Sequence, residues 1–335
     1  MKKALSNAAF LFVLFNTINA QTLQNDNFNS YTIGNVGTDI TSTTPGQGGF
    51  YTLFTGGANS DAQIVNVDAS HGNSLQLTGS ATATGQKYMW KDGLVAAWAA
   101  RTPGNNIIKL NFNLYTGSVT GGVGRGAAMI YDTTTHKTLV GIGYNYATKK
   151  IIGIGRYTDN TTGQTANFGF NLGATTYPAN TWIPLSCTFD KTTGVATWTT
   201  PENSYDAGPG YTPAAVGEDP FEMDFVSAVE AGNTVAHITS FDDYTLMATN
   251  TAVLGTKEAV AEENSILVYP NPATDFINVE SKLPITKIEI FDTAGRKVNA
   301  ELDHDKIDVR SLIPGTYIIT IEAKGSQFSR KFIKK

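Results

Sequence analysis

Cysteine, charge and long apolar runs are all scarce in this chain of 335 residues. Cys187 is the single cysteine, which excludes an intramolecular disulfide framework and a cysteine-ligated zinc site. Only 16% of the residues are charged, against about a quarter in an average soluble protein. The net charge of −5 argues against nucleic acid as a partner, which would call for clustered Lys and Arg. No stretch approaches the roughly 18 consecutive apolar residues of a membrane-spanning helix.

Apolar residues and glycine are, by contrast, plentiful. Hydrophobic residues make up 41% of the chain, and there are 33 glycines. An apolar fraction of this size supports a sizeable core and excludes intrinsic disorder. Frequent Gly, Thr and Asn are typical of a protein built from strands and tight turns.

The first twenty residues have the three parts of a secretory signal peptide. Lys2 and Lys3 form a basic start, residues 8–15 are apolar, and small residues precede Gln21. The apolar run is too short to span a bilayer. We therefore expect residues 1–20 to be removed during export through the periplasm. The mature protein would then be secreted or held at the outer cell surface.

Charge divides the rest of the chain into two parts. Residues 21–264 hold 20 acidic and 11 basic side chains, whereas residues 265–335 hold 9 acidic and 11 basic ones. Residues 249–264 are small, polar and acidic without the alternation of a strand, which is typical of a linker. The sequence therefore predicts one domain over 21–248, a linker over 249–264 and a second domain over 265–335.

Strand patterns recur throughout the first domain. Apolar and polar residues alternate over 107–115, and two hairpins are predicted with turns at 147–150 and 190–194. Cys187 falls on the apolar side of a strand, as a small core residue. The one helix we expect is short, within 91–100. Many strands joined by short turns favour an all-β fold, a two-sheet jelly-roll sandwich.

Four short strings carry a resemblance to a known fold family. They are DNFNSY at 26–31, GNSLQL at 72–77, the hairpin W-x-x-L-x-x-x-F-D-x-x-T-G at 182–194, and FDDYTL at 241–246. Together they resemble the concanavalin-like lectin and glucanase sandwich over residues 26–248. The resemblance implies a jelly roll that serves either carbohydrate binding or carbohydrate cleavage.

The last 70 residues carry a more specific resemblance, to the type A C-terminal sorting domain of the bacterial type IX secretion system. The matching positions are Tyr269, Pro270, Asn271, Pro272, Asp275, residues 290–295 ending in Gly295, Leu312, Gly315, Thr316, Tyr317, Lys334 and Lys335. The resemblance implies a small immunoglobulin-like β-sandwich, recognised by the type IX machinery as an export tag. Alternation also predicts that Tyr317, Ile319 and Ile321 share one side of a central strand.

A polar and aromatic strand face is the candidate for carbohydrate binding. Rings can stack on the apolar faces of sugars, and amides can take the hydroxyl groups. The candidate residues are Lys109, Asn111, Asn113 and Tyr115 on one strand, Tyr144 and Tyr146 on another, and Trp90 and Trp98 nearby in sequence. The alternative is an outer sheet face that binds nothing.

A calcium site is a second candidate. Asp26 and Asn27 lie near the expected mature start, and Asp242 and Asp243 lie in the last strand of the first domain. Their oxygen atoms suit Ca²⁺, and related sandwiches carry a structural calcium where the first and last strands pair. The alternative is a set of ordinary surface carboxylates.

No catalytic motif is identified. Retaining glucanases of the fold that the chain resembles use Glu-x-Asp-x-x-Glu. Here Glu222 and Asp224 are followed by Ser227, three residues after Asp224, where the motif needs its second Glu. Glu222 and Glu230 would lie more than about 20 Å apart on a straight strand at 3.3 Å per residue, too far for a retaining pair. We therefore expect Glu222 and Asp224 on a solvated strand face.

The sequence supports three functional hypotheses. The first is an exported bacterial protein with a lectin-like domain for carbohydrate binding or adhesion. The second is a polysaccharide-degrading hydrolase or lyase of the same fold, and the third is a structural surface protein without a small ligand. Fold class does not decide among them, because lectins and glucanases share it.

Overall fold

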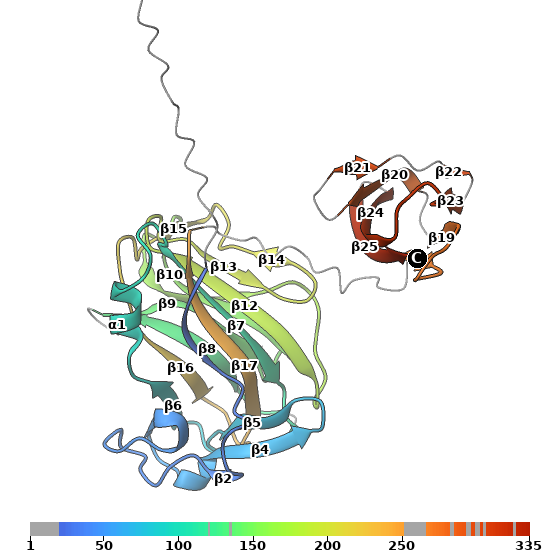
Figure 1. Ribbon diagram of the computed structural model, residues 1–335. Coiled ribbons are helices and arrows are strands. Elements are labelled where there is room, and N and C mark those ends of the chain that lie inside the picture. The colour runs from blue at the N-terminus through green and yellow to red at the C-terminus, as the bar shows by residue number, and fades with distance from the viewer. Residues whose placement is uncertain are drawn as a thin grey trace, which may run out of the picture. The chain divides into compact units, whose positions relative to one another are not determined.

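The computed structural model describes residues 20–119, 121–133, 136–250, 266–281, 285–292, 296–298, 302–303, 306–323 and 326–335. These residues form two compact units that divide within 251–265 (Figure 1). The predicted signal peptide (except Ala20), residues 251–264 of the predicted linker, and Gly295 lie outside the described residues. In the described part of the chain, no helix has the length and apolar character needed to cross a membrane.

The larger unit is a sandwich of two antiparallel sheets, so the predicted all-β fold class is confirmed. One sheet has nine strands in the order β14-β13-β12-β7-β17-β5-β4-β2, with β1 paired to β17. Its strands are β1 (Gln21–Asp26), β2 (Gly34–Asn35), β4 (Ala62–Asp68), β5 (Gly72–Thr78), β7 (Ile107–Tyr115), β12 (Trp182–Asp190), β13 (Ala196–Thr199), β14 (Ser204–Tyr205) and β17 (Ile238–Thr249).

The second sheet of the sandwich has eight strands in the order β11-β10-β9-β8-β16-β6-β3, with β15 paired to β10. Its strands are β3 (Phe50–Phe54), β6 (Gln86–Lys91), β8 (Gly124–Asp132), β9 (Thr138–Asn145), β10 (Lys150–Asp159), β11 (Thr165–Asn171), β15 (Tyr211–Pro213) and β16 (Pro220–Val229). The helices are α1 (Leu94–Ala99) and two short 3₁₀ turns, η1 (Gln47–Gly49) and η2 (Asn59–Asp61). The predicted short helix and both predicted hairpins, β9–β10 and β12–β13, are confirmed.

The core lies between the two sheets and follows from alternation along the strands. On β7 the even-numbered residues from Ile108 to Leu114 are at most 3% exposed, while the odd-numbered ones are half-buried. Cys187 on β12 faces the same core, where burial raises the pKa of its thiol. Cys187 is therefore a core residue, as predicted.

Two glycines on β10 make room for the indole of Trp198. That side chain is fully buried on β13. A Cβ atom added at Gly153 would lie 2.4 Å from the indole, and one at Gly155 would lie 3.2 Å from it. The indole of Trp198, on the nine-stranded sheet, therefore packs directly on the backbone of β10 in the eight-stranded sheet.

A bulge in β17 decides which of its side chains face the core. Its register with β7 shifts between Asp242 and Thr245, and Asp243 has φ 49°, a left-handed conformation that Asp tolerates better than most residues. Because of this extra residue, Phe241 and Tyr244 are both buried in the core although they are three positions apart. Asp242, opposite Asn113, faces outward.

The smaller unit has two four-stranded sheets with a core of its own. One runs β18-β19-β23-β22 and the other β21-β20-β24-β25. Their strands are β18 (Ile266–Tyr269), β19 (Phe276–Ser281), β20 (Ile285–Asp292), β21 (Lys297–Val298), β22 (Leu302–Asp303), β23 (Lys306–Asp308), β24 (Gly315–Ala323) and β25 (Ser326–Lys334). The prediction that Tyr317, Ile319 and Ile321 share one buried side of a central strand is confirmed.

The residues of the predicted sorting motif hold this small sandwich together at its ends. The side chain of Asn271 accepts a hydrogen bond from the backbone of Ile333 (2.9 Å) and donates one to that of Lys331 (3.2 Å). The backbone N–H of Lys335 donates to Ala273 (2.8 Å). The Tyr317 ring stacks on Phe332. The segment around Pro270 and Pro272 is thus joined to the last strand of the chain.

Candidate functional site

The predicted carbohydrate face is split by the structure. Lys109, Asn111, Asn113 and Tyr115 do form a half-buried polar row on the outer face of the nine-stranded sheet. Tyr144 and Tyr146 do not join this row, and this part of the prediction is wrong. Both belong to the core between the sheets, at 4% and 3% exposed.

Specific hydrogen bonds hold these two tyrosines in the core. The hydroxyl of Tyr144 donates to the carbonyl of Tyr177 (3.0 Å). The hydroxyl of Tyr146 bonds that of Thr239 (2.7 Å), and its ring stacks on His237 with centroids 3.7 Å apart. Polar groups satisfied in this way can be buried at low cost, so neither ring is available to a ligand.

Trp98 is also unavailable, although it was predicted as a sugar-binding ring. It lies on α1, is 3% exposed, and donates from its indole N–H to Asp219 (2.6 Å). The guanidinium of Arg101 lies 4.0 Å from its ring centroid. Trp98 therefore joins α1 to the sandwich. Trp90, by contrast, is half-buried on β6 and faces out of the eight-stranded sheet.

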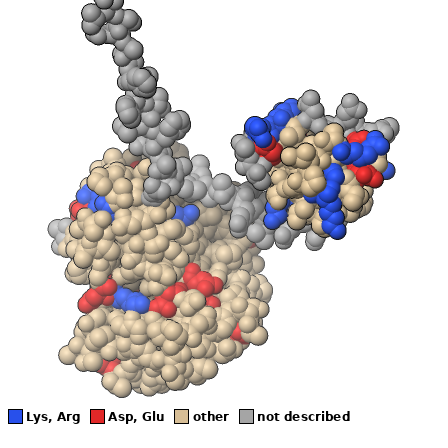
Figure 2. All heavy atoms as spheres, in the orientation of Figure 1, with Lys and Arg blue, Asp and Glu red and all other residues tan. Residues whose placement is uncertain are grey.

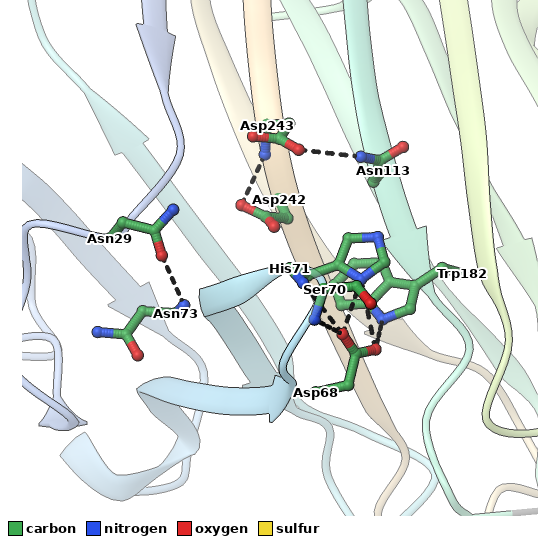
Figure 3. A network of polar contacts seen from close by, with 9 residues as sticks. All are labelled: Asn29, Asp68, Ser70, His71, Asn73, Asn113, Trp182, Asp242 and Asp243. Carbon is green, nitrogen blue, oxygen red and sulfur yellow. Dashed lines mark hydrogen bonds and ion pairs between the residues drawn. The ribbon is translucent and has the colours of Figure 1, made fainter.

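Beside the polar row of β7, the turn between β4 and β5 builds a polar network (Figure 3). The carboxylate of Asp68 accepts hydrogen bonds from His71 Nδ1 (3.0 Å) and Trp182 Nε1 (2.7 Å). The imidazole lies flat on the indole, with centroids 4.1 Å apart. The hydrogen bond from His71, supported by those of Trp182 and Ser70, lowers the pKa of Asp68 to about 2.

Asp242 and Asp243 lie above this network on β17. Burial raises the pKa of Asp242 to about 7, and the neighbouring carboxylate of Asp243 adds to the shift. Asp243 is exposed and accepts a hydrogen bond from Asn113 (3.3 Å). The Oδ2 atom of Asp242 and the hydroxyl of Ser240 are buried without a hydrogen-bond partner among the described residues. The outer face of this sheet therefore carries a compact acidic cluster beside the imidazole of His71.

The four residues predicted to bind calcium do not converge on one point. β1 pairs with β17 as expected, and Asp26, Asn27 and Asp243 line one shallow depression. The carboxylate of Asp26, however, is bound by the ammonium of Lys91 (2.8 Å) and by the Tyr31 hydroxyl. Asp242 does not line the depression.

Charged side chains are sparse on the face of the sandwich that Figure 2 shows. They include a band across its middle in which acidic side chains flank a basic patch, with further basic side chains toward the top. Among the described residues, no three or more His, Cys, Asp or Glu are placed to hold a metal ion. The residues present thus do not fit a calcium ion in this structure. Calcium binding stays a prediction, and a fall in Tm on adding a chelator would be its signature.

A trough of about 540 Å³ lies on the outer face of the eight-stranded sheet. Its floor is part of an apolar cluster from β8, β10 and β16. The members that line the trough are Met129, Ile152, Ile154, Val226 and Ala228, while Ala127 of the same cluster is fully buried. Gly141 and Gly143 of β9 pair with Met129 and Ala127 and face the same way, so the middle strand adds no side chain to the floor. The side chains of Met129 and Ala127 pack over these two glycines instead, since an added Cβ atom would lie 2.9 Å from Met129 and 2.5 Å from Ala127.

Aromatic and polar side chains rise around this floor. The rings are those of Tyr88 and Tyr131, and the amides are those of Asn145, Asn167 and Asn171. The ring of Phe168 faces the other side of β11, where it packs against Tyr211 and the core. At one end Arg125 and Glu230 form an ion pair of 3.0 Å. The trough therefore combines flat apolar surfaces with hydrogen-bonding groups whose positions are set by strands.

Asp224 lies beside the trough and is not on a solvated face, contrary to prediction. It is 3% exposed on β16, opposite Met129 of the trough floor, and its Oδ1 atom has no hydrogen-bond partner among the described residues. Burial, and then the charge of Glu222, raise its pKa well above the ordinary value. Its charge in turn helps to raise the pKa values of Tyr88 and Tyr131, after burial. A buried carboxyl group with a raised pKa therefore lies between two tyrosines beside the trough.

Sequence reasoning missed the trough residues, although one signal was present. Ile151 and Ile152 are consecutive on β10, and both are buried. Consecutive apolar residues in a strand indicate that side chains on both of its faces are shielded from solvent. The positions of Tyr88 and Tyr131 relative to one another depend on the pairing of β16 with both β6 and β8, which local patterns do not specify.

The fold thus defines a β-sandwich protein with a second, smaller β-sandwich domain after it in the sequence. A family model described as the secretion system C-terminal sorting domain matches residues 267–335. This part of the chain is therefore a sorting domain, as the sequence predicted, and the chain is directed to secretion or to the cell surface. No curated protein matches the chain.

Among solved structures, the chain is similar to three carbohydrate-related proteins at low identity. For the sialidase of Trypanosoma rangeli bound to the inhibitor DANA, identity is 12% and the TM-score 0.34, covering 55% of this chain and 26% of the sialidase. For a carbohydrate esterase of the Shiga toxin-encoding bacteriophage phi24B, identity is 12% and the TM-score 0.36, covering 65% of this chain and 99% of the esterase. For an alginate lyase from Chlorella virus, identity is 7% and the TM-score 0.37, covering 56% of this chain and 88% of the lyase. At these scores the similarities carry no functional argument.

Proposed function

We propose that this exported protein binds carbohydrate in the trough of the eight-stranded sheet, as a lectin-like or adhesive domain. The observation that carries the proposal is the combination within one trough of two aromatic rings, three amides and an apolar floor. Signal-peptide removal and passage through the periplasm belong to the same proposal. The sorting domain at 267–335 supports the final step of export.

The chemistry of the trough suits a sugar better than a wholly apolar or wholly charged ligand. Sugars offer apolar C–H faces and a rim of hydroxyl groups. Rings such as Tyr88 and Tyr131 can pack against the C–H faces. The amides of Asn145, Asn167 and Asn171 can donate to and accept from hydroxyls. Binding sites of this kind are concave and mostly apolar, with a few placed polar groups.

A substitution that fills the trough tests the proposal. Gly169 lines it, and a Cβ atom added there meets nothing within 4 Å. We expect Gly169→Phe to abolish binding on a glycan array while leaving the thermal melt unchanged. Gly210→Phe is the matched control, because Gly210 is equally open and does not line the trough. Equal glycan binding by both variants and the wild type would refute this placement.

Polysaccharide cleavage is the second candidate function, and one observation favours it. Asp224 is a buried carboxylic acid whose pKa is raised by burial, beside a trough that could hold a glycan. A carboxylic acid whose pKa is raised is suited to donate its proton to a leaving group as a general acid. Release of reducing or unsaturated ends from a polysaccharide panel by the full chain would favour cleavage over binding alone.

A further inference from the structure

Two aromatic side chains form a platform on the eight-stranded sheet outside the trough. Tyr51 of β3 and Trp90 of β6 are directly opposite one another in the sheet. Their rings are stacked, with centroids 5.8 Å apart and an interplanar angle of 20°. Both are half-buried, so part of each ring reaches solvent. Neither belongs to the core between the sheets.

The platform is continuous with the trough. Trp90 is two residues from Tyr88 on β6, so both side chains leave the sheet on the same face. The register then places one residue from each of seven strands in a single row, running Tyr51, Trp90, Asp224, Met129, Gly141, Ile154 and Gly169. With neighbouring strands about 4.8 Å apart, this row of seven strands is about 29 Å long.

The length of the row distinguishes two kinds of carbohydrate ligand. A terminal sugar would occupy the trough alone and leave the platform empty. A chain lying across the strands would meet the trough and then the platform. Both carry aromatic rings on the same face, with the buried carboxyl group of Asp224 between them.

We propose that Tyr51 and Trp90 form a second subsite, which stacks against a sugar unit of the same chain that fills the trough. The ligand is therefore an extended oligosaccharide or polysaccharide bound along its length across the strands. This inference rests on the proposed function, because it presupposes a sugar in the trough. The packing of Tyr51 on Trp90 holds the exposed indole in one orientation, which lowers the entropy cost of stacking.

Oligosaccharide ladders of alginate, a β-glucan and chitin, from the disaccharide upward, test the subsite by calorimetry on the full chain. For the wild type we expect affinity to rise with chain length. Trp90→Ala should lose this gain, with about tenfold weaker binding of long chains and unchanged binding of the shortest chain that binds. Trp90→Phe keeps a ring and should keep most of the gain. Val216→Ala removes an exposed apolar side chain elsewhere and serves as control.

The outcomes separate the subsite from the proposed function. If Trp90→Ala weakens all lengths equally, or if wild-type affinity does not depend on length, the subsite is refuted while trough binding stands. A wild type that binds none of the ladders, with Gly169→Phe no different, counts against both. A thermal melt of each variant ensures that a loss of binding reflects the site and not unfolding.

Discussion

At the scale of single residues, the carboxyl group of Asp242 shows how burial changes chemistry. It faces out of the nine-stranded sheet but is 1% exposed, and its pKa is raised from 3.8 to about 7. The folded protein therefore holds a proton on this group that the unfolded chain releases. Between about pH 4 and pH 7 the contribution of Asp242 to stability falls as the pH rises.

Asp242→Asn should remove this pH dependence. An amide has no charge to desolvate, so we expect the variant to be more stable than the wild type at pH 8 and to differ little at pH 4. The gain at pH 8 should be on the order of a few kcal/mol, or several degrees in Tm. All four Trp residues lie in the sandwich, so a melt followed by tryptophan fluorescence reports on this unit alone.

The neighbouring carboxylate provides the control for this experiment. Asp243 is exposed, and its left-handed backbone conformation is one that Asn also adopts readily. Asp243→Asn should therefore keep most of the difference between pH 4 and pH 8, because burial of Asp242 is the larger cause of its raised pKa and the charge of Asp243 the smaller one. A wild-type pH profile retained in Asp242→Asn would show that other groups cause it.

At the scale of strands, β10 shows that glycine can be a packing residue. Gly153 faces the core, and an added Cβ atom would lie between 2.4 and 2.7 Å from three atoms of the Trp198 indole. Gly169 lies on the adjacent strand β11 and faces the trough, and a Cβ atom added there would meet nothing within 4 Å. Two glycines in neighbouring strands therefore have opposite tolerance to substitution.

Gly153→Ala should destabilise the sandwich, whereas Gly169→Ala should not. Overpacking of this kind costs about 1–3 kcal/mol. The measurement is urea unfolding followed by tryptophan fluorescence, in which the midpoint should fall with little change in slope. An unchanged midpoint for Gly153→Ala would mean that the indole can move aside and that the core is looser than this packing indicates.

A comparison of individual strands shows which features could be predicted from local patterns. The alternation of 107–115 and the hairpins β9–β10 and β12–β13 were predictable, because a period of two and a turn are properties of a few consecutive residues. The orientation of Tyr144 was not, because β9 is apolar on both faces and gives no alternation to read. Nor was the bulge at Asp243, since it arises where β17 pairs with β7.

At the scale of the whole molecule, the sorting domain and the sandwich have separate hydrophobic cores. Removal of residues 265–335 should therefore leave the sandwich folded but abolish its export to the surface or the medium. Fractionation of cells that express the full and the shortened chain measures this, with tryptophan fluorescence as the test of folding. Equal amounts of both chains outside the cell would exclude the sorting domain as the export signal of this protein.

The sequence by itself determined the all-β class, the hairpins, the core position of Cys187 and the sorting domain at the C-terminal end. Each of these depends on residues that lie close together along the chain. Only the tertiary structure decided that Tyr144 and Tyr146 belong to the core, that Asp224 is a buried acid, and that a trough crosses the eight-stranded sheet. The physical reason is that burial and shape depend on the register between strands far apart in sequence, such as β6, β8 and β16.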